Sequence, residues 1–182
     1  MLRSVSAQAY PVVRSPFEPL ILSSTLGFMM QRLPTPGRTP VWLGRARRPY
    51  GFFSPCEGEE FALLLVLGAD EISPDEQGRL STQFVRQGCR YAVCWGRACS
   101  SWDDSIDMVG VMDEIDGASG PFVMTTWHEG QLLGEVAEFF VRSTSFDDWV
   151  PPHFVVLVVG GTDELEQEVR AAVEEASRLE ST

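Results

Sequence analysis

The chain has 182 residues, which suits one domain with an extension and allows a hydrophobic core that needs no metal or disulfide. Its 26 acidic residues outnumber its 14 basic ones, and the net charge of −12 disfavours nucleic acids and anionic membranes as general partners. Because no segment reaches the ~18 consecutive apolar residues of a membrane span, we expect a cytoplasmic protein that does not enter the membrane.

The N-terminal third, residues 1–60, is rich in proline and arginine and is predicted to be an extension that packs on the rest of the chain. Residues 1–50 carry seven arginines and one acid. This basic segment could fold back onto the acidic remainder or serve as a docking arm for an acidic partner. Prolines break long elements, so only short ones are expected: a helix over residues 19–32 and strands over residues 41–43 and 50–53.

Strands and helices alternate from residue 61 onward, and residues 61–182 are predicted to form a single α/β domain. The continuous apolar run Phe61–Leu67 is typical of a strand buried on both faces of a parallel sheet. Ser73 and Glu76 form a capping box that starts the first helix. The predicted strands cover residues 61–67, 89–95, 122–127 and 153–159, and the predicted helices cover 74–87, 102–115, 130–141 and the residues after Thr162.

This alternation predicts a three-layer α/β/α fold with a mainly parallel four-stranded sheet, Rossmann-like or flavodoxin-like in layout. N-terminal strands would extend the sheet with an antiparallel edge, and the strand order stays open. Ligands of such sheets bind beyond the carboxyl ends of the strands. The candidate residues are therefore those that follow the strands, namely Gly68, Asp70, Glu71, Trp95, Arg97, Cys99, Trp102, Trp127, Gly160 and Gly161.

Three carboxylates after the second strand are candidate ligands of a divalent metal, the one cofactor that the sequence suggests. Asp103 and Asp107 are four residues apart and share a helix face, with Asp104 beside them. Carboxylate oxygens are the ligands that hard divalent cations prefer. A simpler interpretation is that acids in the first turn of a helix offset its macrodipole and cap its free N–H groups.

His128 and Glu129 follow the third strand and are the candidate catalytic residues. Either could act as a general base toward water, but His128 could equally hold a neighbouring loop by hydrogen bonds. Cys99 lies near a predicted helix start, where a thiolate is favoured, so a Cys99–His128 nucleophile–base pair is a further possibility. No second cysteine pair completes a zinc site, and without a secretory signal we expect reduced thiols.

Three tryptophans, Trp95, Trp102 and Trp127, are predicted to lie near the same edge of the sheet. They could simply cover the strand ends. They could also form a flat pocket wall against which a nucleobase or a partner side chain stacks.

A set of short motifs resembles those of a family of small bacterial proteins known only as a domain of unknown function. The resemblance covers Ala62–Val159, and it implies a bacterial origin and one compact domain without adding an activity. The motifs that carry it are Gly88–Ala92, Trp95 with Gly96, Cys99, Trp102–Asp104, Asp107 and Met124–Glu129.

Three functions remain in competition. The strongly acidic surface and the absence of a catalytic signature favour a non-catalytic interaction or regulatory module with a basic protein partner. The alternative from enzymology is a metal-assisted hydrolase or phosphoesterase, with Asp103, Asp104 and Asp107 holding the ion and His128 or Glu129 activating water. The third hypothesis is a small-molecule or nucleotide sensor that uses the tryptophan-lined strand ends.

Overall fold

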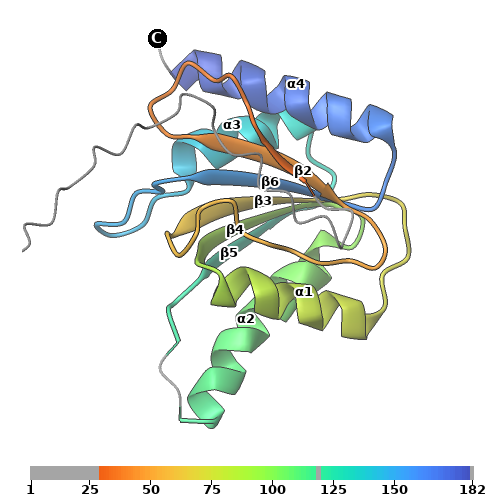
Figure 1. The fold of residues 1–182 in the computed structure, drawn as a ribbon, viewed down its shortest axis with the longest axis vertical. Coiled ribbons are helices and arrows are strands. Elements are labelled where there is room, and N and C mark those ends of the chain that lie inside the picture. Colours follow the sequence, from red (N-terminus) through yellow and green to blue (C-terminus); the bar gives the residue numbers. More distant parts are fainter. Residues whose placement is uncertain (1–28, 118–119, 181–182) are drawn as a thin grey trace, which may run out of the picture.

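A computed structural model describes residues 29–117 and 120–180, and it shows one six-stranded sheet between two pairs of helices (Figure 1). The predicted three-layer α/β/α arrangement with additional strands is thereby confirmed. The strands are β1 (Met30–Arg32), β2 (Val41–Ala46), β3 (Phe61–Leu67), β4 (Cys89–Gly96), β5 (Met124–His128) and β6 (Phe154–Val159); the helices are α1 (Pro74–Arg86), α2 (Cys99–Ile115), α3 (Leu133–Ser143) and α4 (Asp163–Glu180).

The sheet has the strand order β1-β2-β6-β3-β4-β5. β1 pairs antiparallel with β2, and every other neighbouring pair is parallel. The four strands expected from the sequence are β3, β4, β5 and β6 in chain order. In the sheet they lie side by side in the order β5-β4-β3-β6. This is the order of the Rossmann arrangement rather than the flavodoxin-like one. The switch point, where the order reverses, lies between β3 and β6.

Each face of the sheet is covered by one pair of helices. Leu63 and Leu65 of β3 belong to the core that α1 and α2 cover. Leu64 and Val66 belong to the core on the side of α3 and α4. Because side chains alternate between the faces of a strand, an uninterrupted apolar run is what a strand in the middle layer requires.

The N-terminal region contributes more to the sheet than an edge. β2 pairs with β6 along its whole length and is parallel to it, so only β1 is the antiparallel edge strand. The prediction of a strand at residues 50–53 was wrong, although Tyr50 and Phe52 are buried. The helix predicted for residues 19–32 was wrong at Met30–Arg32, which pair with β2 as a strand; residues 19–28 lie outside the described part of the chain.

The helix starts show which local patterns were interpreted correctly. At α1, Ser73 accepts a hydrogen bond from the Glu76 backbone N–H, and the Glu76 side chain accepts one from the Ser73 backbone, as predicted. α2 begins at Cys99, three residues earlier than expected. The preceding residue, Ala98, has a left-handed conformation, and no side chain caps this helix start.

The loops that follow β3 and β6 pack tightly against each other at the switch point. A side-chain carbon added to Gly68 would lie 2.5 Å from the backbone nitrogen of Gly161. One added to Gly160 would lie 2.8 Å from Asp70. The loops after β3 and β6 are therefore in direct contact at the switch point. Over residues 29–117 and 120–180, no helix combines the length and apolar character needed to cross a membrane.

Candidate functional site

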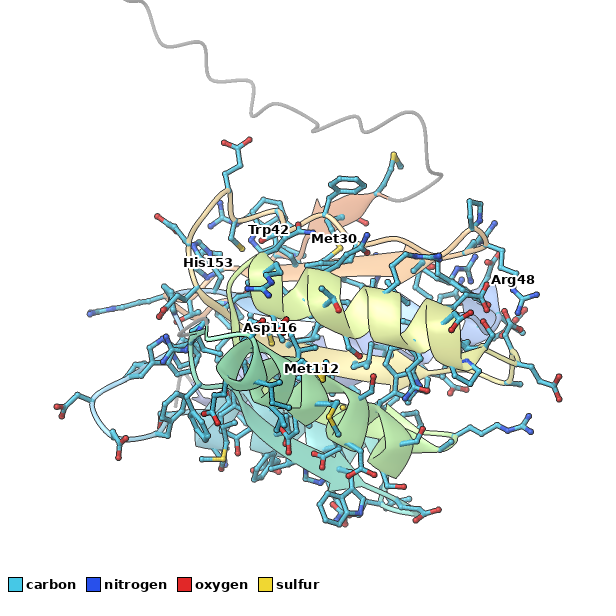
Figure 2. The ribbon with its side chains drawn as sticks, turned by 90° about the horizontal axis from the view of Figure 1, so that it is seen from below. Met30, Trp42, Arg48, Met112, Asp116 and His153 are labelled. Atoms are coloured by element: carbon cyan, nitrogen blue, oxygen red, sulfur yellow. The ribbon has the colours of Figure 1, made fainter. Side chains whose placement is uncertain are left out.

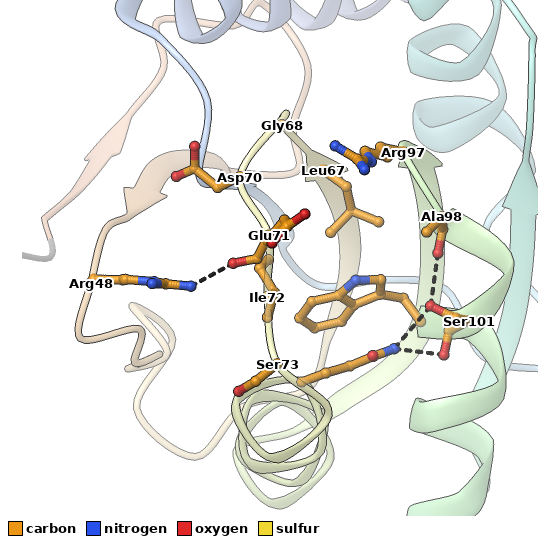
Figure 3. A pocket seen from close by; sticks show the side chains of 12 residues that line it. Arg48, Leu67, Gly68, Asp70, Glu71, Ile72, Ser73, Arg97, Ala98 and Ser101 are labelled. Carbon is orange, nitrogen blue, oxygen red and sulfur yellow. Dashed lines mark hydrogen bonds between the residues drawn. The ribbon is translucent and has the colours of Figure 1, made fainter.

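A pocket of about 420 Å³ opens at the carboxyl ends of β3 and β4, where the Rossmann topology predicts a ligand site (Figure 3). We call it the strand-end pocket. The loop between β3 and α1 forms one wall, and the start of α2 forms the other. The lining residues are Arg48, Leu67, Gly68, Asp70, Glu71, Ile72, Ser73, Gln77, Arg97, Ala98, Ser101 and Trp102.

Charged groups of both signs surround the strand-end pocket. Figure 3 shows Arg48 and Arg97 on opposite sides, with Asp70 and Glu71 between them. Arg48 donates to the backbone oxygen of Glu71, and its guanidinium lies over the ring of Tyr50. Asp70 accepts a hydrogen bond from the Tyr50 hydroxyl at 3.2 Å. The mouth of the pocket therefore carries both positive and negative side chains.

Three arginines at the end of β2 and in the loop after it make ion pairs with acids of the body. Arg48 lies 3.5 Å from a Glu76 oxygen at the start of α1. Arg45, whose side chain is only 7 % exposed, pairs with Asp163 at the start of α4 and lies 3.5 Å from a Glu166 oxygen. Arg47 reaches the same aspartate at 3.0 Å. In this part of the N-terminal region, the basic residues fold back onto the acidic body.

A second hollow, about 650 Å³ in volume, runs between α1 and α2 on the outer side of the same helix pair. We call it the interhelical groove. Met108, Val109 and Met112 line it from α2, and three acids, Asp104, Asp113 and Asp116, also line it. Arg86 is the one basic residue among its lining residues, and it forms an ion pair with Asp113. The two hollows share a wall, in which the Gln77 amide donates to the backbone oxygen of Ser101 at 2.7 Å.

The solvent side of α2 carries an apolar stripe next to the interhelical groove. Met108, Val111, Met112 and Ile115 are each about half exposed or more, and their spacing of three and four residues places them on one helix face. The opposite face of α2 packs on the sheet through Trp102 and Ile106. α2 is thus apolar on two sides, and its C-terminal half projects beyond the sheet in Figure 1.

The three candidate metal ligands differ in their burial and contacts. Asp103 is buried, Asp104 is exposed on the interhelical groove, and Asp107 accepts a 2.9 Å hydrogen bond from Thr125 of β5. None lies in the first turn of α2, so the interpretation that they offset the helix macrodipole was wrong. Within the described ranges, no group of three His, Cys, Asp or Glu side chains is placed to hold a metal ion. The divalent metal stays a prediction.

Burial raises the pKa of Asp103, and the neighbouring charges of Asp107 and Asp104 act in the same direction, whereas a Thr125 hydrogen bond opposes them. One carboxylate oxygen is buried without a hydrogen-bond partner in the described structure. A carboxyl group whose pKa is raised on folding destabilises the fold as pH rises above the pKa of the unfolded chain, about 3.9 for Asp.

We therefore expect Asp103→Asn to be more stable than the wild type at pH 7.5, with a smaller advantage at pH 4, because asparagine never carries the buried charge. Urea unfolding at both pH values measures this difference. Asp104→Asn, at an exposed neighbouring position, serves as the control and should show little change. An advantage of Asp103→Asn that is equal at both pH values would contradict the assignment.

His128 and Glu129 do not come together with the aspartates. The His128 ring packs on Phe139 of α3 at 4.8 Å and makes hydrogen bonds to Gln131 and Thr126. It therefore lies on the face covered by α3 and α4, whereas Asp103 lies on the face covered by α2. Glu129 is exposed in the turn after β5. The structure therefore does not bring His128 together with Asp103 as the hydrolase hypothesis expects.

The tryptophans do not form one wall either. Trp102 is 3 % exposed and lines the strand-end pocket, on the side of α1 and α2. Trp95 packs on the opposite face and donates to the backbone oxygen of Gln131. Trp127 is 55 % exposed on the edge strand β5. Only Trp102 is therefore in a position to contact a ligand in the strand-end pocket.

Cys99 is buried at the first position of α2, and burial raises the pKa of its thiol, while the backbone of His128 donates toward it. The imidazole of His128 lies on the other face, so the two side chains form no nucleophile–base pair. All four cysteines are buried free thiols.

Sequence reasoning missed several residues that line these hollows. Arg48 was missed because it lies in the loop after β2. This loop reaches the strand ends only because β2 pairs parallel with β6, and no local sequence pattern indicates that pairing. Gln77 and Ser101 lie on helices and were not expected at the strand ends. The stripe on α2 did leave a pattern, since apolar residues from Ile106 to Ile115 are too numerous for one helix face.

A family model described as a domain of unknown function (DUF7684) matches residues 48–176. The match covers well over half of the chain and includes the strand-end pocket, the interhelical groove and every candidate residue discussed above. It confirms that the chain resembles a domain of unknown function, and the match reaches beyond Ala62–Val159, whereas β1 and β2 precede it. No curated protein and no solved structure matches the chain.

Proposed function

The chain belongs to the DUF7684 family, a domain of unknown function, and we propose that it is a non-catalytic module that binds a basic protein partner through the interhelical groove. The single observation that carries this proposal is the apolar stripe on the solvent side of α2. Contiguous exposed apolar side chains rimmed by polar residues mark interaction sites on soluble proteins. Met108 and Met112 contribute flexible thioether side chains, which adapt to a partner surface.

The charge around the stripe supports a basic partner. Asp104, Asp113 and Asp116 line the groove together with Arg86. Arg86 and Asp113 neutralise each other, so the negative charge that remains in the groove comes from Asp104 and Asp116. Figure 2, which looks onto the helices α1 and α2, shows Met112 and Asp116 on this open side. A partner that presents apolar side chains flanked by lysine or arginine would complement both features, as an amphipathic helix does in an apolar groove.

A second copy of the chain is a poorer occupant. Every copy has a net charge of −12, and the groove itself is acidic. Two such surfaces repel each other unless basic residues intervene.

The four free thiols also support a reducing, cytoplasmic location for the complex, since disulfides are rare there.

The test uses a fluorescent lysine–leucine peptide that folds as an amphipathic helix, with its affinity measured by anisotropy. We expect Met108→Ser with Met112→Ser to weaken binding at least about tenfold, because anchoring apolar side chains carry most of the energy of such interfaces. The matched control is Leu132→Ser with Val150→Ser, two residues that are more exposed than the methionines but lie outside the groove. Binding should also weaken with added salt.

Equal losses of peptide affinity in the two double variants would mean that the peptide binds nonspecifically, through overall charge or exposed apolar surface. The proposal would then fail. Sedimentation of the protein alone covers the remaining alternative. A concentration-dependent dimer that Met112→Ser abolishes would identify a second copy as the occupant and would equally overturn a basic partner.

A further inference from the structure

The mouth of the strand-end pocket holds a cation and an anion that are not paired with each other. Arg97 uses one guanidinium nitrogen to donate to the backbone oxygen of Ala69 at 3.3 Å. The Glu71 backbone oxygen accepts a hydrogen bond from Arg48, whose guanidinium also pairs with Glu76. The Glu71 carboxylate makes no ion pair within the described ranges. In Figure 3 both side chains lie at the same opening. Each retains capacity for an oppositely charged group of a ligand.

The interior of the same pocket is apolar and aromatic. Trp102, Leu67 and Ile72 line it beneath the charged mouth. Trp102 and Leu67 are almost fully buried and expose only a small surface. The volume of about 420 Å³ lies in the range of small-molecule sites and exceeds the volume of any amino-acid side chain.

Charge decides which class of ligand fits. A simple anion would meet Arg97 but would be repelled by Asp70 and Glu71. A simple cation would meet the two acids but would be repelled by Arg48 and Arg97. A molecule that carries both charges a few bonds apart satisfies Arg97 and Glu71 at once, and an apolar substituent on it would reach Trp102.

We propose that the strand-end pocket binds a small zwitterion of the α-amino-acid type with an apolar side chain. The carboxylate of the ligand pairs with Arg97, its ammonium group pairs with Glu71, and its side chain packs on Trp102 and Leu67. This site is separate from the protein-binding groove proposed above, from which the Gln77–Ser101 hydrogen bonds divide it.

Three probes with the same phenyl group test the requirement for both charges: L-phenylalanine, 3-phenylpropanoate, which lacks the ammonium group, and 2-phenylethylammonium, which lacks the carboxylate. Affinity is measured on the full chain by isothermal titration, and the indole N–H resonance of Trp102, assigned with Trp102→Phe, reports where the probe binds. We expect saturable binding of phenylalanine that shifts this resonance. Each singly charged probe should bind at least about tenfold more weakly, which is the loss of one charge-assisted contact.

Two surface variants assign the charges. In Arg97→Gln, phenylalanine should bind no better than 2-phenylethylammonium binds to the wild type. In Glu71→Gln, phenylalanine should bind no better than 3-phenylpropanoate does. Arg142→Gln, at an arginine of α3 paired with Glu138, is the matched control and should bind phenylalanine like the wild type. Met112→Ser, in the interhelical groove, should also leave it unchanged, so this result and that of the peptide test can fail separately.

Three outcomes would overturn the proposal. Phenylalanine could fail to bind up to its solubility limit. A singly charged probe could bind as tightly as phenylalanine, which would make the pocket a plain anion or cation site. Finally, binding could leave the Trp102 resonance unmoved, which would place the probe elsewhere on the protein.

Discussion

The Gly68→Ala variant is expected to lose about 1–3 kcal/mol of unfolding free energy, because the added carbon has no free space. It would lie 2.5 Å from the backbone nitrogen of Gly161 and 2.6 Å from its Cα. Both atoms belong to the backbone, and Gly161 has a positive φ of 77°. The loop after β6 must therefore shift as a unit. Urea unfolding followed by circular dichroism measures the loss.

The matched control for Gly68 is Gly78 in the middle of α1, where an added carbon meets nothing within 4 Å. Gly78→Ala should stabilise the protein by about 0.5–1 kcal/mol, since alanine favours the helix and restricts the unfolded chain. The two substitutions are chemically identical, so opposite signs isolate the packing at the switch point. Wild-type stability of Gly68→Ala would show that the loops after β3 and β6 are not in close contact.

A still larger loss, about 3–5 kcal/mol, is expected for Phe84→Ala, which empties a fully buried site between α1 and the sheet. The Phe84 ring packs edge-on against Phe52 with 5.1 Å between the centroids. Phe52 in turn lies 5.8 Å from Phe61 of β3. A loss of this size is a large share of the stability of a typical domain. Thermal and urea unfolding should both register it.

Phe53→Ala provides the comparison for Phe84, because Phe53 is the next residue after Phe52 and is 46 % exposed. Its removal should cost well under 1 kcal/mol, as is usual for surface positions. If the two phenylalanine variants lost similar amounts, the segment around residues 50–53 would not cover the face of the sheet as the structure has it.

Local sequence patterns were sufficient to predict most of the helices and strands. The apolar runs of β3 and β6 were recognised because a strand covered on both faces needs apolar side chains at every position. The start of α1 was recognised because Ser73 and Glu76 bond to each other's backbone within one turn. The start of α2 was missed because the left-handed Ala98 has no characteristic side chain.

The sequence predicted where the candidate site lies, but only some of the residues that line it. Topology alone led to Gly68, Asp70, Glu71, Arg97 and Trp102, since the ends of parallel strands meet at one edge. Whether Asp103 could approach His128 depended on a single residue of strand register, because each step along β5 moves a side chain to the other face. The sequence does not encode that register in any short pattern.

The sequence by itself determined the alternating α/β order, which local patterns encode. That order in turn determined the parallel character of the central strands and the edge at which ligands would bind, because a strand–helix–strand unit returns its second strand parallel to the first. Only the tertiary structure decided that β2 joins β6, that Arg48 reaches the strand-end pocket, and that the apolar stripe of α2 stays uncovered by residues 29–117 and 120–180. These depend on contacts between distant segments, whose energy is set by packing and is absent from any local window.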